Sequence, residues 1–246
     1  MKARRVKKLD PRSPLADNAA RIIRVRLDEM LSFAPAALEF ERIRDQHDMR
    51  IAAKRLRYIL ETTEFCFGKP AEAARRRARD LQDLLGELHD CDVMLPRVEG
   101  HLAALRAEDA AAVRERAGDS PDVDPRLATR AQHRTVYSGL EVLAVYVQAR
   151  RRLLFDRFRE FWVEQERVGT WKRLEEAVGR HLRAVKDRRR AAKRAGRARR
   201  DLESAERCAR EAASLAASAA AELQAARGMA PERAANRPPV TSERPH

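Results

Sequence analysis

The sequence predicts an all-α fold: an antiparallel helical bundle of about six helices with a long basic and Ala-rich C-terminal helical extension. Apolar residues recur with helical spacing along most of the 246-residue chain. Alternating β-branched runs bounded by turn residues, which would predict strands, are not seen. From residue 183 onwards a basic block and then an Ala-rich run replace the mixed apolar residues. One globular domain followed by a helical extension is therefore expected.

The first two helices are predicted from their start and stop signals. Ser13 precedes Pro14 in the pattern of an N-cap followed by proline at the first helical position. This helix should end before Pro35. A second helix is expected over residues 38–67, because Gly68 follows it as a stop signal.

A third helix is expected to start at Pro70 and to bury leucines at i, i+3, i+4 and i+7, namely Leu81, Leu84, Leu85 and Leu88. A fourth should cover residues 93–117 with a bend at Pro96. Residues 118–125, rich in Gly, Asp, Ser and Pro, form the clearest internal loop.

A fifth helix is predicted over residues 126–167, and a turn at Gly169 leads into a sixth. The fifth should bury seven apolar residues: Val136, Leu140, Leu143, Val147, Leu154, Phe158 and Phe161. Trp162 and Trp171 flank the turn, and we interpret them as core residues rather than as platforms for base stacking.

Four segments follow from this division of the chain. Residues 1–12 form a basic N-terminal arm, and residues 13–182 form the helical bundle. Residues 183–228 form the basic and then Ala-rich helical extension. Residues 229–246, which contain several prolines and arginines, are expected to be disordered.

The most informative stretch is residues 47–61, whose charged side chains fall on one side of a helix. His47, Arg50, Lys54, Arg57, Tyr58 and Glu61 lie within an arc of roughly 100°. No carboxylate stands between Asp48 and Glu61, although the cations repel one another at helical spacing. A ligand with many phosphates would balance them, and a solvated polar face is the alternative.

The helix that follows carries a second polar face, made of Arg75, Arg79, Gln82, Gly86 and His89. A glycine within a helix costs about 1 kcal/mol relative to alanine. Gly86 therefore indicates the close approach of a neighbouring backbone or a ligand, or else a loosely packed helix crossing.

Composition favours a polyanionic partner. The chain has 52 Lys and Arg against 38 Asp and Glu, and its net charge is +14. Such a chain attracts nucleic acid, anionic membranes or polyphosphate. Three cysteines at unrelated spacings match neither a disulfide framework nor a metal site, so a reducing cytoplasm is expected. Neither a signal peptide nor a membrane span is predicted.

Two sequence blocks carry a resemblance to a known family. The first is His47-x-x-Arg50-x-x-x-Lys54-Arg55-x-Arg57-Tyr58-x-x-Glu61, and the second is Leu81-Gln82-x-Leu84-Leu85-Gly86-x-x-x-Asp90-x-Asp92-Val93. In this order they resemble the CHAD family, the conserved histidine α-helical domain, from about residue 13 to about residue 182.

The resemblance implies a helical module that binds inorganic polyphosphate, is found on polyphosphate granules, and has neither catalytic activity nor a cofactor. The Glu-x-Glu-x-Lys motif of the phosphohydrolase domain to which some members are fused is not seen, so the stand-alone form is expected. The family usually has two similar halves, and this chain shows one clear copy. Arg134 and Arg151 are proposed for the opposing wall from their position alone. His89 stands where the family is expected to have Arg or Asn.

The resemblance and the side-chain chemistry together give ten candidate polyphosphate-binding residues: His47, Arg50, Lys54, Arg57, Tyr58, Arg75, Arg79, His89, Arg134 and Arg151. Arginines can fork onto phosphate oxygens, whereas Lys54 acts as a mobile point charge. Two roles stay open for His47, a donor charged by the anion or a neutral bridge between helices.

Two other functions are weighed. A nucleic-acid-binding protein would use the net charge and the basic tail, but aromatic residues make up only 5% of the chain. A metal-dependent HD phosphohydrolase would use His47-Asp48 or His89-Asp90, although adjacent helical residues diverge by about 100°. Oligomeric state is left open.

Overall fold

The computed structural model describes residues 2–119 and 121–228. Within them the elements are α1 (Leu15–Leu31), α2 (Ala34–Ala37), α3 (Ile43–Thr63), the 3₁₀ turn η1 (Glu64–Cys66), α4 (Lys69–Ala117), α5 (Pro125–Thr129), α6 (Arg134–Arg167) and α7 (Thr170–Gly228). The predicted all-α class is confirmed. The tail predicted to be disordered, residues 229–246, lies outside the described residues.

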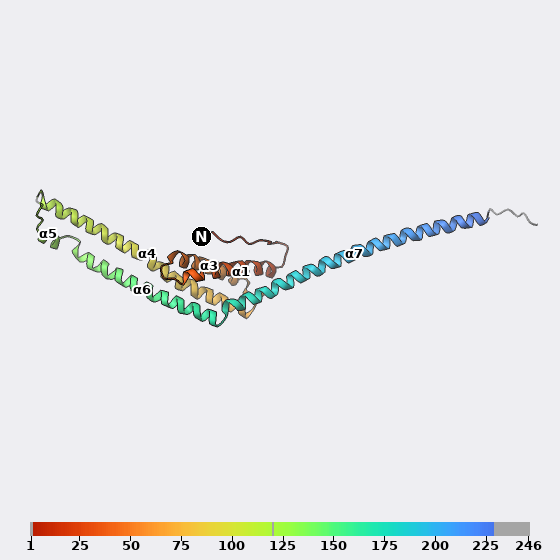
Figure 1. Cartoon of the computed structure of the whole chain (residues 1–246), viewed down its shortest axis with the longest axis horizontal. Coiled ribbons are helices and arrows are strands. Elements are labelled where there is room, and N and C mark those ends of the chain that lie inside the picture. The colour runs from red at the N-terminus through yellow and green to blue at the C-terminus, as the bar shows by residue number, and fades with distance from the viewer. Residues whose placement is uncertain (1, 120, 229–246) are drawn as a thin grey trace, which may run out of the picture. The chain divides into compact units, whose positions relative to one another are not determined.

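The chain divides into two compact units, residues 1–185 and 186–246, and each is considered by itself. In the first unit α1 packs on α3, α3 packs on α4, and α4 packs on α6 (Figure 1). Helices α1, α3, α4 and α6 and the start of α7 contribute large, fully buried side chains to one core: Ile23, Leu27, Met30, Met49, Leu56, Leu60, Leu81, Leu85, Leu88, Phe158, Trp162 and Leu174. This packing fixes the face that α3 turns away from the core.

The N-cap predicted at Ser13 is wrong. The first helix begins at Leu15, and Pro14 occupies the N-cap position without a side-chain capping bond. The Ser13 hydroxyl instead donates to Asp10 Oδ2 at 3.1 Å. Its hydroxyl therefore stabilises the turn before the helix rather than the helix end.

The helix predicted over residues 38–67 is shorter at both ends, because α3 begins at Ile43 and ends at Thr63. Buried Gln46 donates to the carbonyl oxygens of Glu39 (2.9 Å) and Phe40 (3.3 Å). These bonds satisfy backbone acceptors of the turn before α3, where a continuous helix would have used backbone N–H groups.

The two helices predicted before the loop are one. Helix α4 runs from Lys69 to Ala117 and contains Pro96 in its interior. Proline lacks an N–H, so the carbonyl of Asp92 loses its helical donor there. Buried Cys91 before the proline and buried Val98 after it keep α4 packed on both sides of the interruption. Tertiary packing with α6 thus outweighs the local break.

After the loop, the helix predicted over residues 126–167 is divided into α5 and α6. Asp124 caps α5 by accepting a bond from the backbone N–H of Arg126 at 2.8 Å. Val147, Leu154 and Phe158 are buried as predicted, but Val136 and Leu143 are 42% and 37% exposed. Helix α4 is the main neighbour of α6, so the first turns of α6 have little to pack against.

The turn between α6 and α7 is confirmed at Gly169, which has a φ of +67° that favours glycine. Trp162 and Trp171 are buried beside it, with ring centroids 6.1 Å apart in a stacked arrangement. Helix α7 runs from Thr170 to Gly228 without interruption, past residue 182 where the bundle was expected to give way to the extension. The change of composition there is therefore not a helix boundary.

Candidate functional site

Four basic side chains of α3, His47, Arg50, Lys54 and Arg57, form what we call the α3 row. Helix α3 is fixed by Met49, Leu56 and Leu60, which are fully buried against the neighbouring helices. Because these apolar residues alternate with the row at helical spacing, the row is held on the opposite side of the helix. The predicted segregation of charge on α3 is confirmed.

Arg50 lies across α4 at Gly86. Its Nε is 3.5 Å from the position that a Cβ would take on Gly86, and Nη2 is 4.0 Å away. The neighbour of Gly86 is therefore a side chain of α3, at ordinary van der Waals distance, rather than the backbone or the ligand that the sequence suggested. A larger residue at position 86 would occupy the space where this guanidinium rests.

His47 lies against His89 of α4, with ring centroids 4.5 Å apart and ring planes tilted by 45°. Burial, followed by the His89 ring, lowers the pKa of His47 below its ordinary value. The folded chain therefore disfavours a charged His47 near neutral pH. Of the two predicted roles, the neutral bridge between helices describes His47 in the free protein.

The contacts of His47 with His89 and of Arg50 with Gly86 share one antiparallel register between α3 and α4. Continued along the helices, this register places Lys54 opposite Gln82 and Arg57 opposite Arg79. Most of the two polar faces singled out in the sequence thus meet along one line, which we call the seam. It consists of His47, Arg50, Lys54 and Arg57 on α3 and of Arg79, Gln82, Gly86 and His89 on α4.

Several polar atoms of this seam are buried and have no hydrogen-bond partner within the described residues: His47 Nδ1, Arg50 Nε, Arg57 Nε and Gln82 Oε1. Buried polar atoms in folded proteins are nearly always paired. Three of these four atoms belong to the α3 row. The row therefore has hydrogen-bonding capacity left for an added group.

Carboxylates neutralise the row only weakly. Arg57 Nε lies 3.6 Å from Glu61 Oε1, beyond a normal hydrogen bond. Arg50 and Lys54 have no carboxylate partner in the part of the chain that the structure describes. Tyr58, 47% exposed, offers its ring to Lys54 Nζ at 5.6 Å and to Arg57 Cζ at 4.9 Å. Its ring thus helps to hold two cations together.

Arg75 and Arg79 extend the seam along α4, but they differ in their partners. Arg75 Nε donates to Glu64 Oε2 at 2.6 Å, which ties η1 to α4. Arg79 Nε is 3.7 Å from Asp83 Oδ2, and both side chains are largely exposed. Arg79 is therefore free to turn towards an anion, whereas Arg75 already has a close carboxylate.

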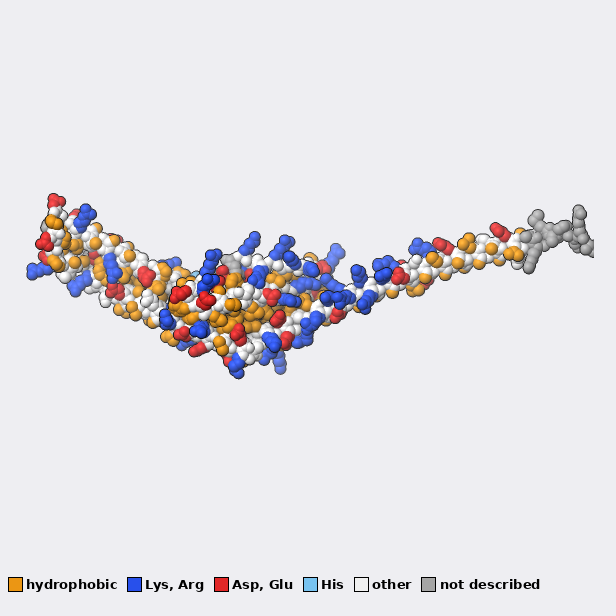
Figure 2. Space-filling model, in the orientation of Figure 1, with side chains coloured by type: hydrophobic (Ala, Val, Ile, Leu, Met, Phe, Trp, Pro, Cys, Tyr) orange, Lys and Arg blue, Asp and Glu red, His pale blue; other side chains and the backbone are white. Residues whose placement is uncertain are grey.

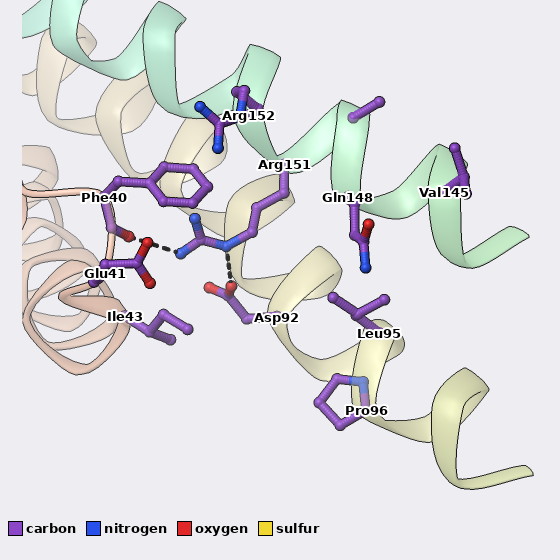
Figure 3. Close-up of a pocket in the computed structure, with 11 residues that line it drawn as sticks. Phe40, Glu41, Ile43, Asp92, Leu95, Pro96, Val145, Gln148, Arg151 and Arg152 are labelled. Carbon is purple, nitrogen blue, oxygen red and sulfur yellow. Dashed lines mark hydrogen bonds and ion pairs between the residues drawn. The ribbon is translucent and has the colours of Figure 1, made fainter. Parts of the chain in front are cut away.

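Arg151 is not part of the seam. It is 7% exposed, and it forms an ion pair with Asp92. Its Nη2 donates to the Phe40 carbonyl at 3.2 Å (Figure 3). The same Nη2 also donates to Gln46 Oε1 at 3.2 Å. Through these contacts Arg151 joins α6 to α4 and to the turn before α3. Arg151 therefore does not form the predicted basic wall opposite the α3 row.

Arg134 is also separated from the α3 row. It stands at the start of α6, where its Nη1 donates to the Thr129 carbonyl at 3.2 Å. Its neighbour His133 binds Asp109, which lies 23 residues beyond Gly86 on α4. At about 1.5 Å of rise per residue this is roughly 35 Å. No sequence signal could have shown this distance.

A cleft of about 560 Å³ opens where α4 and α6 meet the turn before α3 (Figure 3). Its walls are mainly apolar, and Arg151 and Arg152 stand at one side. None of the α3 row lines it. The cleft and the seam are therefore distinct features of the first unit.

The two histidine–aspartate pairs, His47-Asp48 and His89-Asp90, do not form a metal-binding site with other side chains of the described residues. His47 and His89 are neighbours, but the described residues hold no group of three or more His, Cys, Asp or Glu side chains arranged for a metal ion. In the same residues no helix is long and apolar enough to cross a membrane.

Comparison with known proteins gives one match. Residues 2–99 match the family model of the CHAD domain, which confirms the resemblance drawn from the two sequence blocks over that range. The match contains the whole α3 row and His89. No curated protein and no solved structure matches the chain.

Proposed function

We propose that the segment matching the CHAD domain, residues 2–99, binds inorganic polyphosphate along the seam between α3 and α4. One observation carries this proposal: the α3 row is weakly neutralised and keeps buried, unpaired N–H groups on two arginines. A phosphate chain supplies negative charge and hydrogen-bond acceptors together.

The spacing of the row suits a linear ligand with repeated charge. His47, Arg50, Lys54 and Arg57 follow one another about one helical turn apart, or about 5.4 Å. Arg50 and Arg57 can each direct two N–H groups at phosphate oxygens, and Lys54 adds a mobile charge. A lone carboxylate would engage only one of these groups, whereas a phosphate chain would engage them in succession.

His47 gives the site a titratable member. Its pKa is lowered in the free protein by burial and by His89. A phosphate chain on the row would favour the charged imidazole and raise that pKa. We expect the protein to take up a proton when polyphosphate binds near pH 6.5, which would add the charged donor of the second predicted role.

The same site supports a binding role without catalysis. The groups along the seam are cations and hydrogen-bond donors, which retain a phosphate chain. We propose that the protein associates with polyphosphate granules in the cytoplasm through this seam. Nucleic acid is the second candidate, favoured by the net charge of +14.

A competition titration separates the two ligands. Labelled long-chain polyphosphate is bound to the full chain at about 0.15 M salt, and unlabelled polyphosphate, RNA and DNA are added at equal phosphate concentration. In parallel, lysines are acetylated and read by mass spectrometry. Polyphosphate should displace the label, RNA and DNA should not, and Lys54 should be protected while exposed Lys172 is not.

The matched variants are Arg50→Ala with Arg57→Ala and, as a control, Arg76→Ala with Arg97→Ala, two exposed arginines of α4. The first pair should remove Lys54 protection and weaken binding at this site by about tenfold or more. The control should change little. Unaltered Lys54 protection in the first variant, or equal competition by nucleic acid, would refute the proposal.

A further inference from the structure

The second unit contains a charged surface that the proposed seam does not use. It consists of α7 from residue 186 onward, a helix exposed along nearly all of its length. Figure 2 shows blue Lys and Arg side chains gathered on its first part, and mostly orange and white side chains beyond. We propose that this first part is a second polyphosphate-binding site, an inference that rests on the proposed function.

The basic part is dense and free of acid. Residues 188–200 contain eight Lys and Arg and no Asp or Glu. Five of the eight line one shallow cleft of about 530 Å³, and we call them the extension stripe: Arg190, Lys193, Arg194, Arg197 and Arg200. Their spacing of three or four residues places them on one side of the helix.

Within the described residues, carboxylates do not neutralise the stripe. Arg199, outside the stripe, pairs with Glu203 at 3.0 Å. The five stripe residues have no carboxylate partner within the described part of α7. Like charges at this spacing destabilise a helix, so an anion along the stripe would stabilise it. Binding there is therefore expected to increase helicity.

The chemistry of the extension points to bare phosphate chains. Residues 186–228 contain no aromatic residue, no Asn and no His. Stacking of bases on aromatic rings, a usual means of holding single-stranded nucleic acids, therefore has no side chain to carry it. What remains are cations that recognise phosphate oxygens. A linear polyphosphate presents those oxygens without bases or sugars.

With a second site on the same protein, both the stoichiometry and the affinity of binding should depend on the length of the polyphosphate. The stripe covers eleven residues, from Arg190 to Arg200, and is about 15 Å long. A short polyphosphate of about that length should fill either site alone, so that two molecules bind per protein. A long chain can occupy both sites at once, and the second contact is then intramolecular. Long chains should therefore bind more tightly than short ones at equal phosphate concentration.

The experiment is a calorimetric titration of the full chain with short and long polyphosphate, combined with lysine acetylation. Protection of Lys193 from acetylation reports that the stripe is occupied, and protection of Lys54 reports that the seam is occupied. In the stripe variant all five residues become Gln, which keeps good helix propensity. A charge-matched control changes five exposed arginines of the first unit to Gln: Arg97, Arg114, Arg116, Arg126 and Arg130.

The wild-type chain should bind two short molecules and protect both Lys54 and Lys193. The stripe variant should bind one, keep Lys54 protection, and lose about tenfold in affinity for long chains. The control variant should retain both sites. A stoichiometry of one without Lys193 protection, equal losses in the control, or protection of Lys193 by DNA rather than by polyphosphate would each overturn the inference. Failure of Lys54 protection alone would instead count against the proposed function.

Discussion

The imidazole rings of His47 and His89, which belong to different helices, lie 4.5 Å apart at the start of the seam. Two cations at this distance would repel each other, and burial adds to the cost of charging His47. Asp48 acts in the opposite direction, and Arg50 adds to the lowering. The pair therefore links the stability of the α3–α4 packing to pH.

We predict that the free protein loses stability as the pH falls below about 6.5. The unfolded chain binds a proton at His47 in this range while the folded chain resists it, so protonation favours unfolding. In urea unfolding at pH 7.5 and 5.5, His47→Gln should show a smaller difference than the wild type. Exposed His101→Gln serves as the control, and an unchanged difference in the His47 variant would contradict the assignment.

Gly86 gives a test that separates stability from binding. Gly86→Leu should gain up to about 1 kcal/mol of helix propensity, but its side chain would displace the Arg50 guanidinium. We expect intact helicity and a loss of about fivefold or more in short-chain affinity at the seam. Gly100→Leu, at a position with open space in the same helix, should leave that affinity unchanged. Equal affinity for short-chain polyphosphate in both variants would show that binding does not require the Arg50 guanidinium to rest on Gly86.

The buried ion pair of Arg151 and Asp92 is expected to support the fold rather than the site. Both side chains are less than a tenth exposed. Arg151→Met should cost about 3 kcal/mol in the free energy of unfolding, because Asp92 is left unpaired. Removing the exposed pair by Arg150→Met should cost less than about 1 kcal/mol. Denaturant titrations measure both, and similar costs would contradict the difference in burial.

Asp109 is expected to hold the far ends of α4 and α6 together. Its carboxylate accepts bonds from the His133 backbone at 3.1 Å and from the Tyr137 hydroxyl, and it lies 3.0 Å from the His133 ring. Burial, reinforced by this carboxylate, raises the pKa of Tyr137 to about 12. Asp109→Ala should cost roughly 2 kcal/mol and speed hydrogen exchange at the start of α6. Slow exchange at the start of α6 in this variant would show that packing alone holds these ends of α4 and α6 together.

The helical class and the charged face of α3 could be predicted because both follow from short-range periodicity. Arg50, Lys54 and Arg57 share a face in any helix that contains them. The contact between His47 and His89 could not be predicted, because it depends on how η1 sets the register of two helices. Gly86 could be singled out from the sequence, but that a side chain of α3 contacts it, rather than a backbone or a ligand, required the structure.

Long-range pairing also explains the errors. Arg151 has the same local sequence signature as an exposed arginine, and its partner Asp92 is 59 residues away. The sequence predicts two helices between Pro70 and residue 117, yet packing against α6 keeps α4 continuous through Pro96. Buried Gln46 shortened α3 by bonding to the preceding turn. In each case tertiary contacts decided the outcome over local preference.

The buried stacking of Trp162 on Trp171 has a practical consequence. These are the only tryptophans of the chain, and both report on the junction of α6 and α7. Neither belongs to the seam nor to the extension stripe. Intrinsic tryptophan emission will therefore follow unfolding of the first unit with little direct optical signal from bound polyanions. The same fluorescence melt can be recorded with and without polyphosphate, so the stabilisation by ligand can be measured without attaching a dye.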